Sequence, residues 1–263
     1  MVSWNQNAPL NFMNTPTLPP DLSEATLCPS CGGQVSRGQR LCPACLITTF
    51  ATREAEDFKE EARERDLAAL QRSWALLKCP PEYCATQWSK IDQHPLLSPA
   101  CATLAKHFWV GDAQHGLAMH GASGTGKTRA AWDILRRHHF ARRWTCAFVK
   151  SFDFAHWART AERGRGSDRT EAFRSIDRAK KVDLLVFDDL GTESYDQTVA
   201  GFVWDLFEVR TSQRRPIIVT TEHDGKSLTE KFLPTAKGDA NRIIRRIREF
   251  CQDANVNLPQ ALP

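Results

Sequence analysis

Apolar and polar positions alternate in two ways from about residue 82 onward. Short apolar runs, each long enough for one buried strand, recur between segments whose apolar residues follow one face of a helix. The predicted strands are Gly116–His120, Thr145–Val149, Val182–Phe187 and Ile217–Thr221. The predicted helices include Thr128–Arg137 and Gln197–Thr211. This alternation is typical of a doubly wound α/β domain, in which a parallel sheet is flanked by helices.

The chain ahead of this domain has a different pattern. The first 24 residues are rich in Pro and Asn and predict a flexible tail, with a short partner-binding motif as the alternative. Residues 51–78 carry alternating charges and a narrow apolar stripe, which predicts a largely exposed helix ending at Cys79-Pro80-Pro81. The expected parts are a tail (1–24), a cysteine-rich module (25–50), a connecting helix (51–78), the main domain (79–255) and a C-terminal tail (256–263).

The loop after the first predicted strand matches the phosphate-binding pattern G-x-x-x-x-G-K-[ST] at every fixed position. Its residues are Gly121, Ala122, Ser123, Gly124, Thr125, Gly126, Lys127 and Thr128. The glycines let backbone N–H groups turn inward around phosphate oxygens, and the next helix points its N-terminus at the same anions. Lys127 is expected to bind the phosphates, and Thr128 to ligate Mg²⁺. A chance match is the alternative, which the flanking strand and helix disfavour.

The third predicted strand ends in two carboxylates, Asp188 and Asp189. An apolar run that ends this way is typical of the Walker B strand of nucleotide hydrolases. Asp188 is expected to hold Mg²⁺, and Asp189 to orient or deprotonate the attacking water. A strand that ends in a solvated acidic turn is the alternative. With the phosphate loop upstream, the pair predicts a Mg²⁺–ATP site.

Four cysteines near the start of the chain have the spacing of a metal site. Cys28 and Cys31 form one C-x-x-C pair, and Cys42 and Cys45 form a second. Two such pairs can present four sulfurs to one tetrahedral zinc ion. Because the segment is too short to build its own core, zinc would supply its folding energy. Free surface cysteines and a redox pair are the alternatives, and we expect a structural zinc module.

Composition limits the classes of protein that fit. The 263 residues are 41% hydrophobic and 25% charged, as in a soluble globular protein. No apolar run approaches the roughly 18 residues of a membrane span, and no secretion signal is visible, so a cytoplasmic protein without a membrane role is expected. Nine cysteines in such a chain favour reduced thiols or metal over disulfides.

The region from about 79 to 251 resembles the DnaC/IstB-type branch of the AAA+ ATPases. The matching stretches are the phosphate loop, the acidic strand, Phe-Glu-Val-Arg210 before the Thr-Thr strand, Cys79-Pro-Pro-Glu-Tyr, and Arg245-Arg-Ile. The resemblance implies a lidless AAA+ fold that is preceded here by the zinc module and the connecting helix. It also implies a slow ATPase that forms an ATP-dependent homo-oligomer.

The resemblance implies two further site residues. Thr221, at the polar end of the fourth strand, takes the place of the sensor that positions the attacking water, and Glu222 stands where this family often has Asn. Arg246 takes the place of the arginine finger, which reaches the ATP of a neighbouring subunit. Arg245 is a competitor for that role, and a basic helix face exposed to water or DNA is the alternative for both.

The basic residues gather in three clusters, at 136–143, 159–181 and 242–248, although the net charge is only +4. After the second strand, Phe154, His156 and Trp157 precede several arginines around Gly164 and Gly166. Aromatic rings beside arginines suit single-stranded DNA, and the resemblance places the strand-gripping insertion of replication initiators here. An amphipathic helix with buried rings, or a protein-binding surface, remains an alternative.

Three functions fit these observations. The first is a loader of a replicative DNA helicase that binds single-stranded DNA, because a zinc module, linker and lidless ATPase domain resemble the Gram-positive-type loaders. The second is a transposition helper ATPase, although such helpers usually lack a four-cysteine module. The third is a nucleotide-controlled protein-interaction switch without a DNA role.

Overall fold

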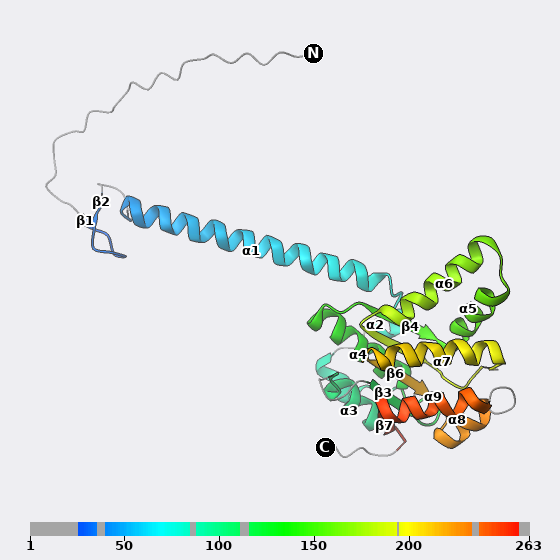
Figure 1. The fold of residues 1–263 in the computed structure, drawn as a ribbon. Coiled ribbons are helices and arrows are strands. Elements are labelled where there is room, and N and C mark those ends of the chain that lie inside the picture. The colour runs from blue at the N-terminus through cyan, green and yellow to red at the C-terminus, as the bar shows by residue number, and fades with distance from the viewer. Residues whose placement is uncertain are drawn as a thin grey trace, which may run out of the picture. The chain divides into compact units, whose positions relative to one another are not determined.

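A computed structural model describes residues 26–35, 40–84, 88–110, 116–193, 195–232 and 237–257. The chain divides into two compact units, residues 1–65 and 66–263 (Figure 1). The predicted tail at 1–24 and most of the predicted tail at 256–263 lie outside the described residues.

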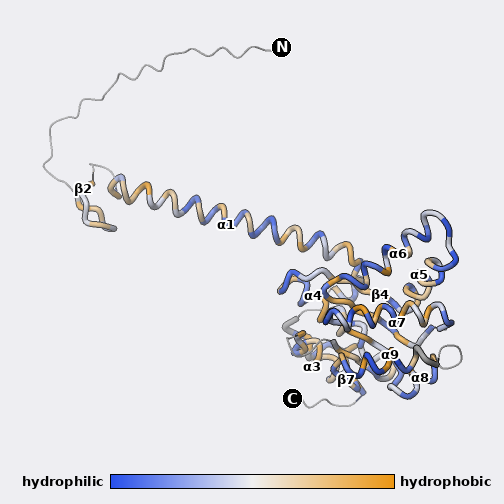
Figure 2. The backbone as a smooth tube through the Cα atoms, in the orientation of Figure 1, coloured by the Kyte–Doolittle hydropathy of each residue, from blue (hydrophilic) through white to orange (hydrophobic). Residues whose placement is uncertain are grey.

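The first unit contains a small hairpin and the beginning of a long helix. Strand β1 (Thr26–Leu27) pairs in an antiparallel manner with β2 (Gln34–Val35). Helix α1 (Pro43–Ala75) then runs across the boundary between the units, and its colouring in Figure 2 alternates between hydrophilic and hydrophobic. The connecting helix therefore begins well before residue 51, directly at the second cysteine pair.

The second unit is built on a parallel sheet of five strands in the order β4-β5-β6-β3-β7. The strands are β3 (Gly116–His120), β4 (Cys146–Lys150), β5 (Leu184–Asp188), β6 (Ile217–Thr221) and β7 (Gln252–Asn255). The first four agree with the predicted strands to within two residues. The fifth was not predicted, because Gln-Asp-Ala-Asn has no apolar run.

Helices cover both faces of the sheet. They are α2 (Pro81–Cys84), the 3-10 helix η1 (Trp88–Gln93), α3 (Pro99–His107), α4 (Lys127–Arg142), α5 (Ser151–Arg163), α6 (Gly166–Lys181), α7 (Gln197–Ser212), α8 (Gly225–Phe232) and α9 (Lys237–Phe250).

Successive strand residues pack into opposite cores, as the two-residue period of a strand requires. In β5, Leu184 and Val186 pack with α3 and α4, whereas Leu185 and Phe187 pack with α5 to α9. The predicted α/β architecture is confirmed, and the ends of these strands bring the phosphate loop and the acidic pair together.

Only part of the apolar stripe of α1 packs against other residues. Within the second unit, Trp74 near the end of α1 packs against the core, with its ring 5.8 Å from that of Trp132. Farther toward the start of the helix, Ile47, Phe50 and Phe58 are exposed. None of the helices in the described part of the chain has both the length and the hydropathy of a bilayer span.

Candidate nucleotide and metal sites

The phosphate loop connects β3 to the first turn of α4. Gly124 and Gly126 have φ angles of 77° and 90°, which side chains other than glycine rarely adopt. A Cβ at Gly126 would lie 2.5 Å from the carbonyl oxygen of Leu96, so the tight turn excludes any side chain there. Lys127 Nζ donates to the carbonyl oxygens of Gly121 (2.9 Å) and Ala122 (2.8 Å), which holds its ammonium across the loop.

Two hydroxyl groups converge on Asp188 at the end of β5. Thr128 Oγ1 donates to Asp188 Oδ1 at 3.0 Å, and Thr220 Oγ1 donates to the same oxygen at 2.6 Å. Burial raises the pKa of Asp188 to about 6, and the hydrogen bond from Thr220 opposes this rise. A hydroxyl and a buried carboxylate at the phosphate loop form the donor set that Mg²⁺ prefers, so the residues fit the expected ion.

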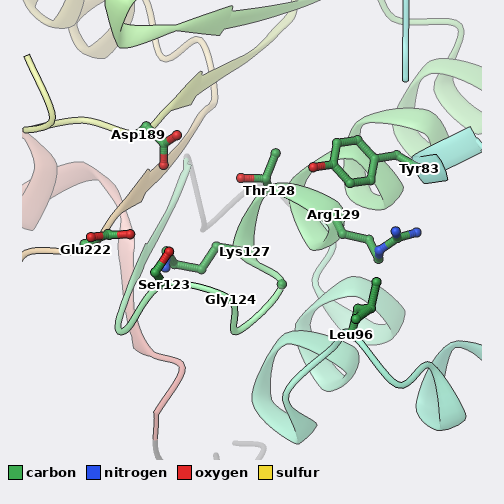
Figure 3. Close-up of a pocket in the computed structure, with 10 residues that line it drawn as sticks. Tyr83, Leu96, Ser123, Gly124, Lys127, Thr128, Arg129, Asp189 and Glu222 are labelled. Atoms are coloured by element: carbon green, nitrogen blue, oxygen red, sulfur yellow. The ribbon is translucent and has the colours of Figure 1, made fainter. Parts of the chain in front are cut away.

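Asp189 and Glu222 line the nucleotide pocket opposite the phosphate loop (Figure 3). Asp189 has a φ of 60°, and its backbone N–H donates to Thr220 Oγ1 at 2.9 Å. This cavity has a volume of about 330 Å³. Its walls are formed by Tyr83, Leu96, Ser123, Gly124, Gly126, Lys127, Thr128, Arg129, Asp189 and Glu222.

The side chain of Thr221 is not among these walls. Its hydroxyl donates to the carbonyl oxygen of Leu190 at 2.5 Å and accepts the N–H of His223 at 3.1 Å. Of the two threonines, Thr220 contacts the acidic pair. The sequence offered one signal for Thr220 and Glu222. They stand at the carboxyl end of β6, the acidic pair stands at the carboxyl end of β5, and the carboxyl ends of adjacent parallel strands meet at one edge of the sheet.

The far wall of the pocket was not predicted. Arg129 lies over the ring of Tyr83 at 4.9 Å and donates to the carbonyl oxygen of Glu82 at 2.5 Å. With Leu96, these side chains form a partly apolar wall beside the glycines of the loop (Figure 3). A planar base can pack against such a wall while its phosphates extend to Lys127.

Arg246 lies away from the nucleotide pocket of its own chain. Its Nε and Nη2 donate to the two carboxylate oxygens of Glu208 on α7, at 2.8 and 3.0 Å, and its guanidinium lies 5.9 Å from the ring of Trp204. The competitor Arg245 is more exposed and lies 3.7 Å from Glu249. Among the described residues, neither arginine lines the pocket, and a role for either one in a neighbouring subunit stays a prediction.

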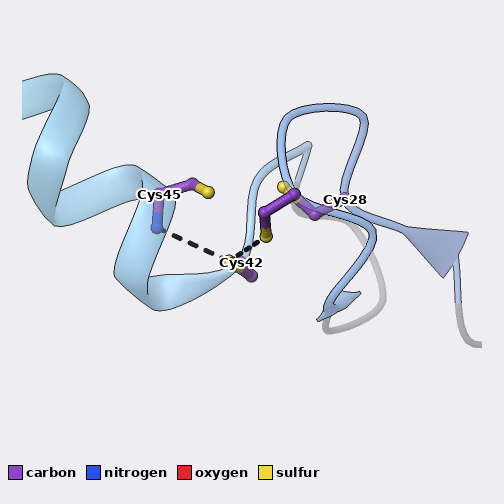
Figure 4. A group of neighbouring side chains, drawn as sticks. Cys28, Cys42 and Cys45 are labelled. Atoms are coloured by element: carbon purple, nitrogen blue, oxygen red, sulfur yellow. Dashed lines mark hydrogen bonds between the residues drawn. The ribbon is translucent and has the colours of Figure 1, made fainter.

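The four predicted metal ligands come together in the first unit (Figure 4). The Sγ atoms of Cys28, Cys31, Cys42 and Cys45 all lie within 4.8 Å of one another. Tetrahedral zinc–sulfur geometry needs sulfurs about 3.8 Å apart, so the cluster fits the ion.

Backbone groups favour thiolates in this cluster. The backbone N–H of Cys42 lowers the pKa of Cys28 to about 6, and the N–H of Cys45 lowers the pKa of Cys42. Cys42 Sγ accepts the Cys45 N–H at 3.5 Å at the start of α1, where a helix favours negative charge. Hydrogen bonds with the sulfurs of Cys31 and Cys42 raise the pKa of Cys45 to about 12, so without a cation the four sulfurs do not all lose their protons.

The predicted DNA-binding segment folds as α5 and α6, and two of its three predicted rings, those of Phe154 and Trp157, pack within the domain, whereas His156 is exposed. Phe154 is fully buried and Trp157 packs against the core, so the expectation that bases stack on these rings is wrong for Phe154. Arg159 pairs with Asp196 at 2.9 Å. The exposed rings of this region are those of Phe152, His156 and Phe173.

The parallel sheet, the phosphate loop and the acidic strand end define an ATP-binding protein with the AAA+ P-loop fold. The family described as IstB-like ATP-binding protein matches residues 51–253, and the chain belongs to this family. Among curated proteins, none matches this sequence.

Two crystal structures share the fold. One, described as DnaI, is 20% identical over 67% of this chain and 94% of its own, with a TM-score of 0.54. The other, described as the DnaC helicase loader, is 16% identical over 66% of this chain and 98% of its own, with a TM-score of 0.50.

Proposed function

We propose that this protein is a slow, ATP-dependent assembly switch that loads a replicative DNA helicase onto single-stranded DNA. The observation that supports the ATPase part is the nucleotide pocket, which is lined by Lys127, Thr128, Asp189 and Glu222. Asp188 accepts a hydrogen bond from the Thr128 hydroxyl at this pocket. Hydrolysis needs charge neutralisation at the γ-phosphate. Because Arg246 lies on α9 outside the pocket, a second subunit would supply that charge.

Each residue has a role in this proposal. The N–H groups of the loop and Lys127 bind the phosphates, whereas Thr128 and Asp188 hold Mg²⁺, which lowers the charge on the phosphate oxygens. Asp189, supported by Thr220, accepts a proton from the attacking water. Glu222 is the second polar group beside that water, and it takes the sensor position that the sequence suggested for Thr221.

The loader part rests on the four-cysteine cluster that precedes the ATPase domain and on the fold shared with a helicase loader. The cluster and the exposed apolar residues at the start of α1 offer a surface for the helicase. The arginines of α5 and α6, with Phe152 and Phe173, offer one for single-stranded DNA.

A transposition helper is the second candidate, because the matching family is that of the IstB-like proteins. Affinity capture with a hexameric helicase and with a transposase, each with and without ATP, separates the two. Helicase capture supports the loader, transposase capture supports the helper, and capture of neither partner leaves only the nucleotide-controlled switch.

The ATP site is tested by Lys127→Ala. This variant should lose ATP binding by at least tenfold and lose ATP-dependent assembly, because no other ammonium lines the pocket within the described residues. Isothermal titration with ATP and light scattering with and without ATP measure both. Lys181→Ala, an exposed lysine paired with Asp177, is the matched control. Assembly retained in Lys127→Ala contradicts the proposal.

A further inference from the structure

The basic cluster at residues 136–143 lies at the opposite end of α4 from the phosphate loop. This helix has 16 residues, so its ends are about 24 Å apart at the rise of an α-helix. Its last turn meets the segment after α3 and the segment before β4. We call the exposed side chains at this point, Lys106, Trp109, Arg142 and Arg143, together with the half-buried Trp144, the aromatic–arginine patch.

The guanidinium of Arg142 lies between two indole rings in this patch. Its central carbon is 5.2 Å from the ring centre of Trp109 and 5.0 Å from that of Trp144. Among the described residues, no carboxylate forms an ion pair with Arg142, and the guanidinium of Arg137 lies over the ring of Trp109 as well, 4.8 Å from its centre. Trp109 is 40% exposed, which is a large area for an indole that packs against its own domain.

The rings are held in place from behind. His138 is fully buried and lies 4.5 Å from the ring of Trp109 and 5.5 Å from that of Trp144. Its Nε2 accepts the N–H of Val110 at 3.0 Å, and its Nδ1 donates to Ile134 at 2.8 Å. The patch is therefore preorganised and needs little ordering when a ligand binds.

A cavity continues from the patch along the other side of Trp144. It has a volume of about 390 Å³, and Arg143, Arg178 and Lys181 line it together with leucines from the end of α1. Arg143 also pairs with Asp66 at 2.7 Å, and this pair is largely exposed. The surface thus combines flat rings, an apolar hollow and several cations.

Arginines near the C-terminus of a helix ordinarily offset the helix dipole, and this accounts for part of the charge. It does not account for two indole rings on either side of an arginine with no carboxylate partner. An acidic peptide would use the cations but not the rings. Unstacked nucleotides use both, because bases stack on rings while cations contact phosphates.

We propose that the aromatic–arginine patch binds single-stranded nucleic acid, with bases on Trp109 and Trp144 and phosphates on Arg142 and Arg143. The patch is separate from α5 and from the nucleotide pocket, and the cavity beside it is also lined by Arg178 and Lys181 of α6. The proposal rests on the patch alone, so it does not depend on the ATPase or the loader function.

The test uses the full chain and fluorescence anisotropy with a labelled oligothymidylate across a range of salt concentrations. Trp109→Leu removes one stacking ring and should weaken binding at least about fivefold, the lower limit of the loss for one stacked base. Arg142→Gln should weaken binding and lower the salt slope by about one phosphate contact. Arg65→Gln makes the same charge change at an exposed arginine paired with Glu61, and it should leave binding unchanged.

The other ligands of the test are polyglutamate and a duplex of the same length, and ATP affinity serves as the folding control. If Trp109→Leu lowers the melting temperature, the result for Arg142→Gln decides the test, because the side chain of Arg142 is exposed. The proposal is overturned if the wild type binds no oligothymidylate, or if both variants bind it as Arg65→Gln does. The proposal is also overturned if the two variants lose as much affinity for polyglutamate or for the duplex as for oligothymidylate, because the rings would then have no part in recognition.

Discussion

Thr220 is the residue through which strand β6 reaches both members of the acidic pair. Its hydroxyl donates to Asp188 and accepts the backbone N–H of Asp189, so one buried side chain fixes the position of both. Thr221, which the family resemblance suggested, bonds instead to the backbone around Leu190. The two threonines are adjacent in sequence, and because successive strand residues point to opposite faces, only one of them can contact Asp188.

Replacing Thr220 by Val should therefore impair catalysis more than the same change at Thr221. Val keeps the shape but removes both hydrogen bonds, and we expect kcat for ATP to fall at least about tenfold, or 1.4 kcal/mol in activation free energy. Steady-state ATPase assays at saturating Mg²⁺–ATP measure the change. A larger loss of kcat in Thr221→Val would return the sensor role to Thr221.

His138 gives the protein a sensitivity to acid at a site far from the ATP. Burial lowers the pKa of His138 to about 4, with the hydrogen bond to Ile134 opposing this shift. The unfolded chain has the ordinary histidine pKa of about 6.5, so it binds more protons than the folded chain between these values. Stability from this group is therefore present above pH 6.5 and is lost as the pH falls toward 4.

We expect the wild type to lose about 2 kcal/mol more stability than His138→Gln between pH 7 and pH 5. Urea unfolding of both proteins at the two pH values gives the difference. Asp133 and Asp188, whose pKa values burial raises to about 6, act in the opposite direction, but they are present in both proteins and cancel. Parallel pH profiles for the two proteins would show that His138 is not the titrating group.

At the scale of elements, the start of α1 and the cysteine cluster form one structure. Cys42 precedes the helix and Cys45 lies in its first turn, so the second cysteine pair also defines where the helix begins. This explains why α1 starts earlier than the predicted residue 51. The first turn contains no acidic residue, and the Cys42 sulfur takes the place of a capping oxygen.

Removing the metal should therefore loosen the beginning of α1 but not the ATPase domain. The fourfold change of Cys28, Cys31, Cys42 and Cys45 to Ser should release about one zinc per chain, measured by elemental analysis. Hydrogen exchange should speed up at the start of α1, while ATP affinity stays unchanged. Cys101→Ser, which alters a buried thiol away from the cluster, should keep the zinc. A wild type without zinc would contradict the prediction.

The elements that the sequence predicted well are those whose side chains carry a strong local pattern. The run Leu184–Phe187 is apolar on both faces, so strand β5 was visible, and the glycines with Lys127 marked the loop. Strand β7 is held by pairing with β3 and not by its own polar residues, so no local pattern reveals it. The wall made by Tyr83 and Arg129 depends on contacts between distant segments, which spacing along the chain cannot show.

At the scale of the whole molecule, the ATP site and the arginine that would complete it lie in different places. The pocket opens beside α4 and β5, whereas Arg246 is held on α9 by Glu208 of α7. This half-buried ion pair is worth roughly 1 kcal/mol, so contact with a neighbouring phosphate can replace it. Assembly of two chains, head to tail, would bring Arg246 of one to the pocket of the other.

A mixture of two inactive variants tests this arrangement. Asp189→Asn removes the group that accepts the proton but keeps ATP binding, assembly and Arg246, and Arg246→Ala keeps the pocket but lacks the arginine. Each variant alone should hydrolyse ATP at least tenfold more slowly than the wild type. In an equal mixture, random neighbours combine an intact pocket with an intact arginine at about a quarter of the interfaces, so activity should recover to about a quarter of the wild-type rate.

Mixing Lys127→Ala with Asp189→Asn, both altered in the pocket, should restore nothing. Without recovery in the first mixture, Arg246 does not act across subunits, and the same experiment with Arg245→Ala then decides whether its neighbour does.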